Sequence, residues 1–62
     1  MYLGEFYWLD NSLNHNIIMT LLGKGIQYKE TSNKEVLANL SGEWKKVRAV
    51  QETNVLWEIW TD

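Results

Sequence analysis

No disulfide can reinforce the fold of this chain, and a structural metal is not expected to do so. The 62-residue sequence contains no cysteine and a single histidine, His15, whereas a structural zinc site draws its ligands mostly from those two residue types. For so short a chain, the free energy gained by burying apolar surface barely exceeds the conformational entropy lost on folding. Stability must therefore come from dense packing of the aromatic residues or from assembly with another chain.

The charge and hydropathy of the sequence exclude several classes of protein. The formal charge of −2 is too small for a DNA mimic and too negative to favour non-specific binding of nucleic acid. No stretch approaches the roughly 20 apolar residues of a membrane span, and the N-terminus lacks the basic-then-apolar pattern of a signal peptide. We therefore expect a single cytoplasmic domain over residues 1–62, with no membrane partner.

The first part of the sequence predicts a strand followed by a helix. Residues 2–9, YLGEFYWL, carry aromatic and aliphatic side chains at both even and odd positions, which predicts a strand that is apolar on both faces. Residues 10–12 are all favoured helix N-caps, and Gly23 stands where a C-cap glycine belongs. Between them, apolar residues recur at spacing four: Leu13, Ile17 and Leu21. Residues 16–22 are also a short apolar run that suits a strand, and periodicity alone does not decide between the two.

The middle of the sequence predicts a strand and a second helix. Residues 26–31 alternate enough to form a strand. Ser32 and Glu35 have the spacing of a capping box, in which the serine accepts from the glutamate amide and the glutamate reaches back. An apolar stripe follows and ends before Gly42: Val36, Leu37 and Leu40. We therefore predict a helix over residues 32–41.

The C-terminal part predicts a β-hairpin, because the segments WKKVRAVQ and VLWEIW flank a short polar loop, residues 52–54. In this loop we expect Asn54 to take a positive φ. The element order is then β-α-β-α-β-β, a small α+β domain of about four strands with two short helices on one face. The alternative is a mostly β small barrel with one helix at residues 32–41.

Two segments resemble a known family. Residues 21–30, LLGKGIQYKE, and residues 35–42, EVLANLSG, are similar to the middle of a glutaredoxin, where a first helix ends in KGI-x-Y and a second ends near LSG. The resemblance covers about half of the chain and implies the element order given above. Residues 11–14, NSLN, stand where that family has its C-x-x-C motif, and the proline after its second helix has no counterpart near Arg48. Thiol–disulfide exchange is therefore not expected.

The predicted sheet has more apolar surface than its helices can cover. In the last strand, odd-numbered residues 55–59 point to one face and even-numbered residues 56–60 to the other, and both sets are largely apolar. Two short helices cover about one face. We predict that the second face is an aromatic stripe edged by cations, and that it binds a partner. Its residues are Tyr7, Trp44, Lys46, Arg48, Leu56 and Trp60. The alternative is that these aromatic side chains fold over one another and complete a wrapped core.

No catalytic arrangement is evident in the sequence. His15 falls on the polar side of the first predicted helix, without a partner that would make it a general base. Glu5 and Glu58 are expected to face each other across adjacent strands, but so small a domain leaves little room for a substrate pocket. Residues 23–25, GKG, lack the length and the Lys-Ser/Thr pair of a phosphate loop. We expect a protein that is not an enzyme and uses no metal or other cofactor.

These observations predict a binding module. We expect it to bind a larger protein, or a second copy of itself, and to modulate that partner stoichiometrically. Small self-contained chains rich in Asn, Lys, Glu and Ile are typical of phage and mobile-element accessory proteins that inhibit host or defence enzymes in the host cytoplasm. The alternative is a module for single-stranded nucleic acid, with Trp44 stacking on a base and the cations of residues 45–48 neutralising phosphates. Those cations equally suit a strand edge that resists aggregation.

Overall fold

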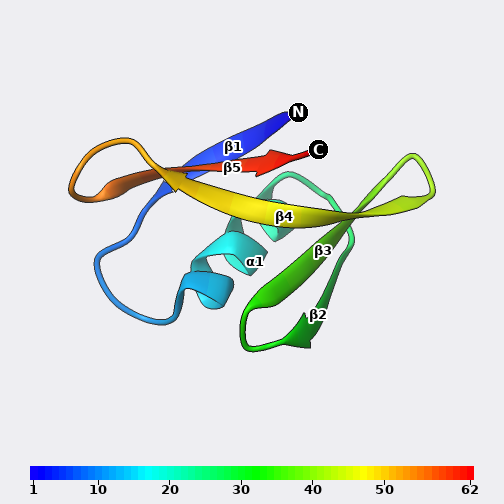
Figure 1. The fold of residues 1–62 in the computed structure, drawn as a ribbon, viewed down its shortest axis with the longest axis horizontal. Coiled ribbons are helices and arrows are strands. Elements are labelled where there is room, and N and C mark those ends of the chain that lie inside the picture. Colours follow the sequence, from blue (N-terminus) through cyan, green and yellow to red (C-terminus); the bar gives the residue numbers. More distant parts are fainter.

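A computed structural model describes residues 1–62 as a five-stranded antiparallel sheet with one helix. The strand order is β1-β5-β4-β3-β2, so α1 connects one edge strand to the other (Figure 1). The chain then returns through successive hairpins until β5 pairs with β1. The elements are β1 (Tyr2–Tyr7), α1 (Leu13–Gly23), β2 (Tyr28–Ser32), β3 (Glu35–Leu40), β4 (Glu43–Gln51) and β5 (Leu56–Thr61).

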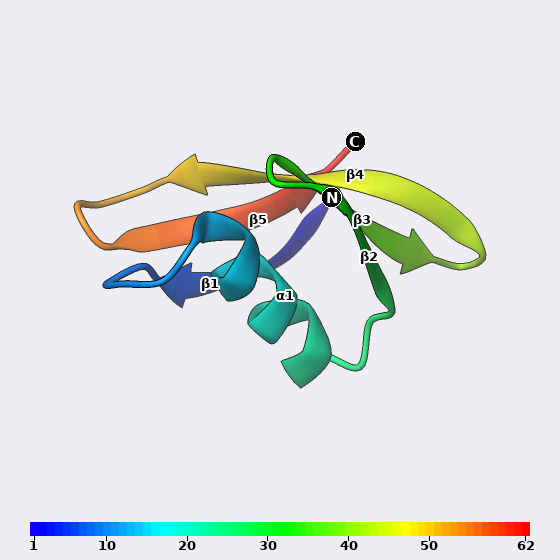
Figure 2. The same cartoon turned by 90° about the horizontal axis from the view of Figure 1, so that it is seen from below.

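The hydrophobic core lies between α1 and one face of the sheet. Figure 2 shows α1 on a single side, where it packs against β1, β2 and β3. Leu21 of α1 and Ile59 of β5 are completely buried there. Burial of one such side chain stabilises the fold by about 1.5–3 kcal/mol. The buried apolar residues form one cluster: Leu3, Phe6, Ile17, Leu21, Val36, Ala38, Val47 and Ile59.

The predicted first helix is confirmed, and residues 16–22 are helical rather than extended. Ser12 is its N-cap, because the Ser12 hydroxyl accepts a hydrogen bond of 3.1 Å from the His15 amide. Neither the length nor the composition of α1, the single helix, would let it cross a bilayer.

The C-terminus of α1 differs in detail from the prediction. Gly23 is the last helical residue and Lys24 is the C-cap, whereas the left-handed residue is Gly25, with a φ of 71°. The Ile26 amide donates to the Leu21 carbonyl at 2.9 Å, which is the long hydrogen bond of a Schellman motif. The glycine that this motif requires is therefore the one that follows the cap.

The predicted second helix is wrong, because residues 32–41 form the end of β2, all of β3 and the start of the next turn. Ser32 caps no helix, and its hydroxyl accepts a hydrogen bond of 3.2 Å from the Lys34 amide in the β2–β3 turn. The carboxylate of Glu35 accepts instead from the Thr31 hydroxyl, at 2.8 Å. The spacing that suggested a capping box therefore belongs to a hairpin.

The spacing of the apolar residues in β3 fits both a helix and a strand. Pairing with the neighbouring strands determines which of the two forms. As a strand, the segment directs Val36 and Ala38 into the core and Leu37 away from it. Val36 also lies opposite Val47, so β3 supplies the hydrogen-bonding partner that β4 needs on this side. This pairing involves residues that are distant in the sequence, and local spacing does not encode it.

The architecture is therefore α+β, as expected, but with one helix and five strands instead of two helices and about four strands. The sheet is open, with β1 and β2 at its edges, so the small barrel with a helix at residues 32–41 is wrong as well. The element order implied by the resemblance to glutaredoxins is absent, because the segment 35–42 that carries it forms β3 and a turn.

Two of the hairpins show how their turns are built. Between β3 and β4, Ser41 and Gly42 both have a positive φ, 56° and 86°, as in the tight turns that match the twist of paired strands. The predicted β4–β5 hairpin is confirmed, but Asn54 does not take a positive φ. The Thr53 hydroxyl closes this loop instead by accepting a hydrogen bond of 3.0 Å from the Leu56 amide.

The core contains one unpaired hydroxyl, which yields a test of the packing. Thr61 lies in β5 opposite Val47, is 1% exposed, and its Oγ1 has no hydrogen-bond partner. Thr61→Val is expected to raise the free energy of unfolding by about 1 kcal/mol, because it replaces a desolvated hydroxyl with a methyl group of similar shape. Urea denaturation measures the change.

Thr61→Ser is the matched control. It keeps the unpaired hydroxyl and removes a buried methyl group, so we expect it to be less stable than the parent. A Thr61→Val variant that unfolds at a lower urea concentration than the parent would contradict this description of the core.

Candidate functional site

The face of the sheet opposite α1 is covered by no other element. Antiparallel partners point to the same face of a sheet, so the register of the strands identifies the side chains that lie there. They come from all five strands. We call this surface the open face, and its residues are Tyr2, Glu5, Tyr7, Lys29, Leu37, Asn39, Trp44, Lys46, Arg48, Val50, Leu56, Glu58 and Trp60.

All the residues predicted to bind a partner lie on the open face. Tyr7 and Leu56 are opposite each other at one end, Arg48 and Trp60 are opposite each other at the centre, and Trp44 lies toward the other end. Tyr7 is 66% exposed and Trp44 is 41% exposed. The sixth residue of the predicted set, Lys46, lies on β4 between Trp44 and Arg48. The predicted set is therefore spread along one surface and does not form a single cluster.

Tyr2 is a central residue of the open face that the sequence did not reveal. Its ring meets Trp60 edge to face, with the ring centroids 5.4 Å apart. Simple alternation along a strand groups Tyr2 with Phe6, which is in the core. A β-bulge between Tyr2 and Gly4 shifts the register, and Gly4 permits it with a φ of 138°. A glycine inside a strand pattern is a sequence signal for such a β-bulge.

The open face is acidic on one side and basic on the other. Glu5 and Glu58 lie opposite each other on β1 and β5, as predicted. Glu58 also accepts a hydrogen bond of 3.3 Å from the indole of Trp60. On the β4 side, Lys46 and Arg48 present cations. The open face therefore carries carboxylates on β1 and β5 and cations on β4.

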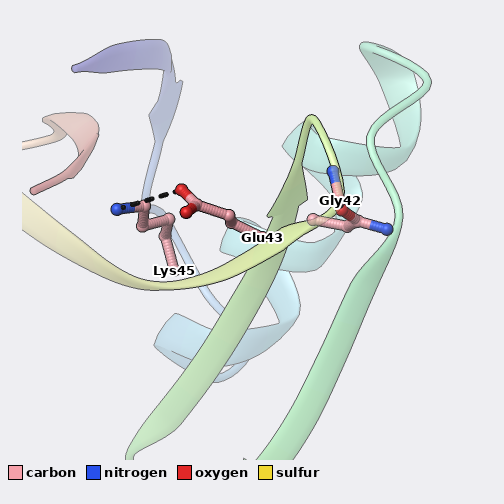
Figure 3. A network of polar contacts seen from close by, with 4 residues as sticks. Gly42, Glu43 and Lys45 are labelled. Carbon is pink, nitrogen blue, oxygen red and sulfur yellow. Dashed lines mark hydrogen bonds and ion pairs between the residues drawn. The ribbon is translucent and has the colours of Figure 1, made fainter.

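The basic segment 45–48 is divided between the two faces. Lys45 points to the face that carries α1 and pairs with Glu43 at 3.4 Å, as Figure 3 shows. Arg48 lies on the open face, 3.7 Å from the carboxylate of Asp62. Most of this segment's charge is thus already close to a carboxylate.

At one end of the open face, a lysine side chain covers one side of an aromatic ring. The ammonium of Lys29 lies 4.4 Å from the centroid of the Trp44 ring, a distance typical of a cation–π contact. One side of the Trp44 ring is therefore occupied in the free protein.

The remaining titratable groups form no comparable site. His15 is exposed on α1, and only its backbone amide takes part in the helix cap. No three or more His, Cys, Asp or Glu side chains gather where they could hold a metal ion.

No protein-family model, no curated protein and no solved structure matches this chain.

The acidic side of the open face yields a test by titration. Partial burial raises the pKa of the Tyr2 phenol above its ordinary value of 10.0, and the charges of Glu5, Glu58 and Glu52 raise it further. Glu58→Gln removes one of these charges, so we expect the pKa of Tyr2 to fall. The phenolate absorbance, compared with and without the Tyr2→Phe change, measures it.

Glu43→Gln is the matched control, because Glu43 pairs with Lys45 and is not among the groups that raise the pKa of Tyr2. This variant should leave the titration of Tyr2 unchanged. Equal titration of Tyr2 in the parent and in Glu58→Gln would show that the two side chains are not neighbours.

Proposed function

We propose that the protein is a non-enzymatic module that binds a larger protein through the open face. The observation that carries the proposal is the position of α1, which covers one face of the sheet and leaves aromatic side chains accessible on the other. Trp, Tyr and Arg contribute most to the energy of protein interfaces. The open face places Trp60, Tyr2 and Arg48 together at its centre, with charged residues around them.

The charge pattern supports a protein partner over nucleic acid. Glu5 and Glu58 would repel a phosphate backbone that ran across the open face. Trp44 has Lys29 over its ring, and Lys45 is on the other face, so neither is free to engage a nucleotide as the sequence suggested. A surface with both charge signs suits a protein with a complementary pattern, because such patterns orient two partners.

In this proposal the module acts by occupying a surface of its partner in a stoichiometric complex. The composition, rich in Asn, Lys and Glu, supports a phage or mobile-element protein that inhibits a host or defence protein. The alternative is self-association through the same surface. In a dimer with a two-fold axis, the acidic side of one open face would lie against the basic side of the other.

Trp60→Ala tests the proposal. Trp60 is outside the core cluster, so we expect the variant to keep its circular dichroism spectrum and most of its stability. It should lose partners captured by the parent from a lysate, or lose self-association on size-exclusion chromatography, at a cost of about 2 kcal/mol or more in binding.

Trp57→Ala is the control on the other face. Trp57 packs against the core and meets Trp8 edge to face at 5.1 Å, so its truncation should cost about 3–5 kcal/mol of stability. If Trp60→Ala unfolded while Trp57→Ala stayed folded, the assignment of the two faces to core and open surface would have to be exchanged. Salt-dependent binding of an oligonucleotide that disappears when Lys45, Lys46 and Arg48 are all replaced by Gln would favour the nucleic-acid alternative.

A further inference from the structure

Half of β4 has no neighbour on one side. β3 pairs with β4 from Glu43 to Val47 and then ends, whereas β5 pairs with β4 as far as Gln51. Figure 1 shows β3 and β4 diverging beyond their paired residues, with α1 in the angle between them. Residues 48–51 of β4 are therefore a third free edge, inside the sheet and separate from the edges formed by β1 and β2.

The register identifies the backbone groups that this edge presents. The Glu52 amide donates to the Leu56 carbonyl, so even-numbered residues at this end of β4 direct their backbone groups toward β5. Ala49 and Gln51 then direct their amides and carbonyls to the side that β3 has left. No side chain of the protein is hydrogen-bonded to either residue. This arrangement of unpaired backbone groups is a template for another strand.

A groove of about 270 Å³ lies along this free edge. Its apolar part comes from Val47 and Ala49 of β4, from Val36 of β3, and from Leu13 and Ile17 at the start of α1. Lys34, in the β2–β3 turn, also lines the groove. The volume is small for a metabolite but suits a few residues of a strand whose ends continue into solvent. It is the one cavity of the molecule.

The charged residues that line the groove are all basic: Lys34, Lys46 and Arg48, of which Arg48 already lies 3.7 Å from the carboxylate of Asp62. Lys46 and Arg48 point to the open face, whereas Ala49 points toward α1. A strand added beside β4 would alternate in the same way. One set of its side chains would enter the apolar part of the groove, and the other set would lie beside the cations. This pattern selects a strand in which apolar and acidic residues alternate.

A buried amide adds a polar partner at the wall of the groove. Asn14 lines the groove and is 7% exposed. Its Nδ2 donates to Glu30 at 2.8 Å and to the carbonyl of Ser32 at 3.0 Å, which leaves its Oδ1 as an unused acceptor.

We propose that the free edge of β4 binds an extended acidic segment of another protein, which adds to the sheet as a strand in line with β3. The backbone of this segment exchanges hydrogen bonds with Ala49 and Gln51, its apolar side chains enter the groove, and its carboxylates lie beside Arg48 and Lys46. This site shares Lys46 and Arg48 with the open face but uses neither Trp60 nor Tyr2, and it does not rest on the function proposed above.

A fluorescein-labelled peptide that alternates valine and glutamate tests the proposal by fluorescence anisotropy. The same peptide with lysine in place of glutamate should not bind. N-methylation of one central valine should weaken binding by at least about tenfold, because it removes a backbone donor to Ala49 or Gln51, whereas N-methylation of the adjacent glutamate should have little effect.

Amide exchange by NMR provides a direct readout of the added strand. In the free protein, the amides of Arg48 and Val50 should be protected by β5, while those of Ala49 and Gln51 exchange quickly. Addition of the peptide should protect Ala49 and Gln51. Lys34→Glu should lower the affinity for the peptide several-fold relative to Lys24→Glu, which makes the same change of charge away from the groove. Trp60→Ala should bind the peptide as the parent does.

Three results would overturn the proposal. The first is the absence of peptide binding at millimolar concentration. The second is equal loss of affinity on N-methylation of valine and of glutamate. The third is protection of Ala49 and Gln51 without peptide in a dimer that forms with rising concentration, because a second copy of the chain would then occupy the edge.

Discussion

Every larger feature of this molecule depends on the packing of one short helix against one side of the sheet. With no cysteine, the chain has no disulfide to add to it. Ile17 and Leu21 of α1 join the buried residues of β1, β3, β4 and β5 in one cluster. A helix of 11 residues has one apolar stripe, so it can fill only one side of a sheet of this width.

That constraint determines where interactions with other molecules are possible. The side of the sheet without a helix keeps aromatic and charged residues in contact with water, and the strong twist moves the β2–β3 hairpin away from the end of β4 (Figure 1). The first feature creates the open face and the second creates the groove at Ala49. The two surfaces follow from the same shortage of covering elements, although we propose different partners for them: a folded surface and an extended acidic strand.

The sequence predicted most of the local structure and the division of residues between the two faces. Alternation placed Ile59 in the core and Trp60 on the open face, because a strand has a fixed period. It failed at Tyr2, where a bulge at Gly4 breaks that period. It also failed at residues 32–41, where the apolar spacing fits a helix and a strand equally and the pairing of β3 with β4 decides. The groove depends on where β3 ends relative to β4, which no local pattern contains.

One face of the sheet is expected to remain open in the isolated protein, and solvent paramagnetic relaxation measures its exposure directly. A soluble nitroxide relaxes protons according to their distance from the solvent. At a concentration where the protein is monomeric, we predict strong relaxation for the exposed side chain of Trp44, intermediate relaxation for the half-buried Trp60 and Leu56, and weak relaxation for Val47 and Ile59. If Trp60 and Leu56 in the monomer were as protected as Ile59, the chain would cover its own second face, and the open face would not exist.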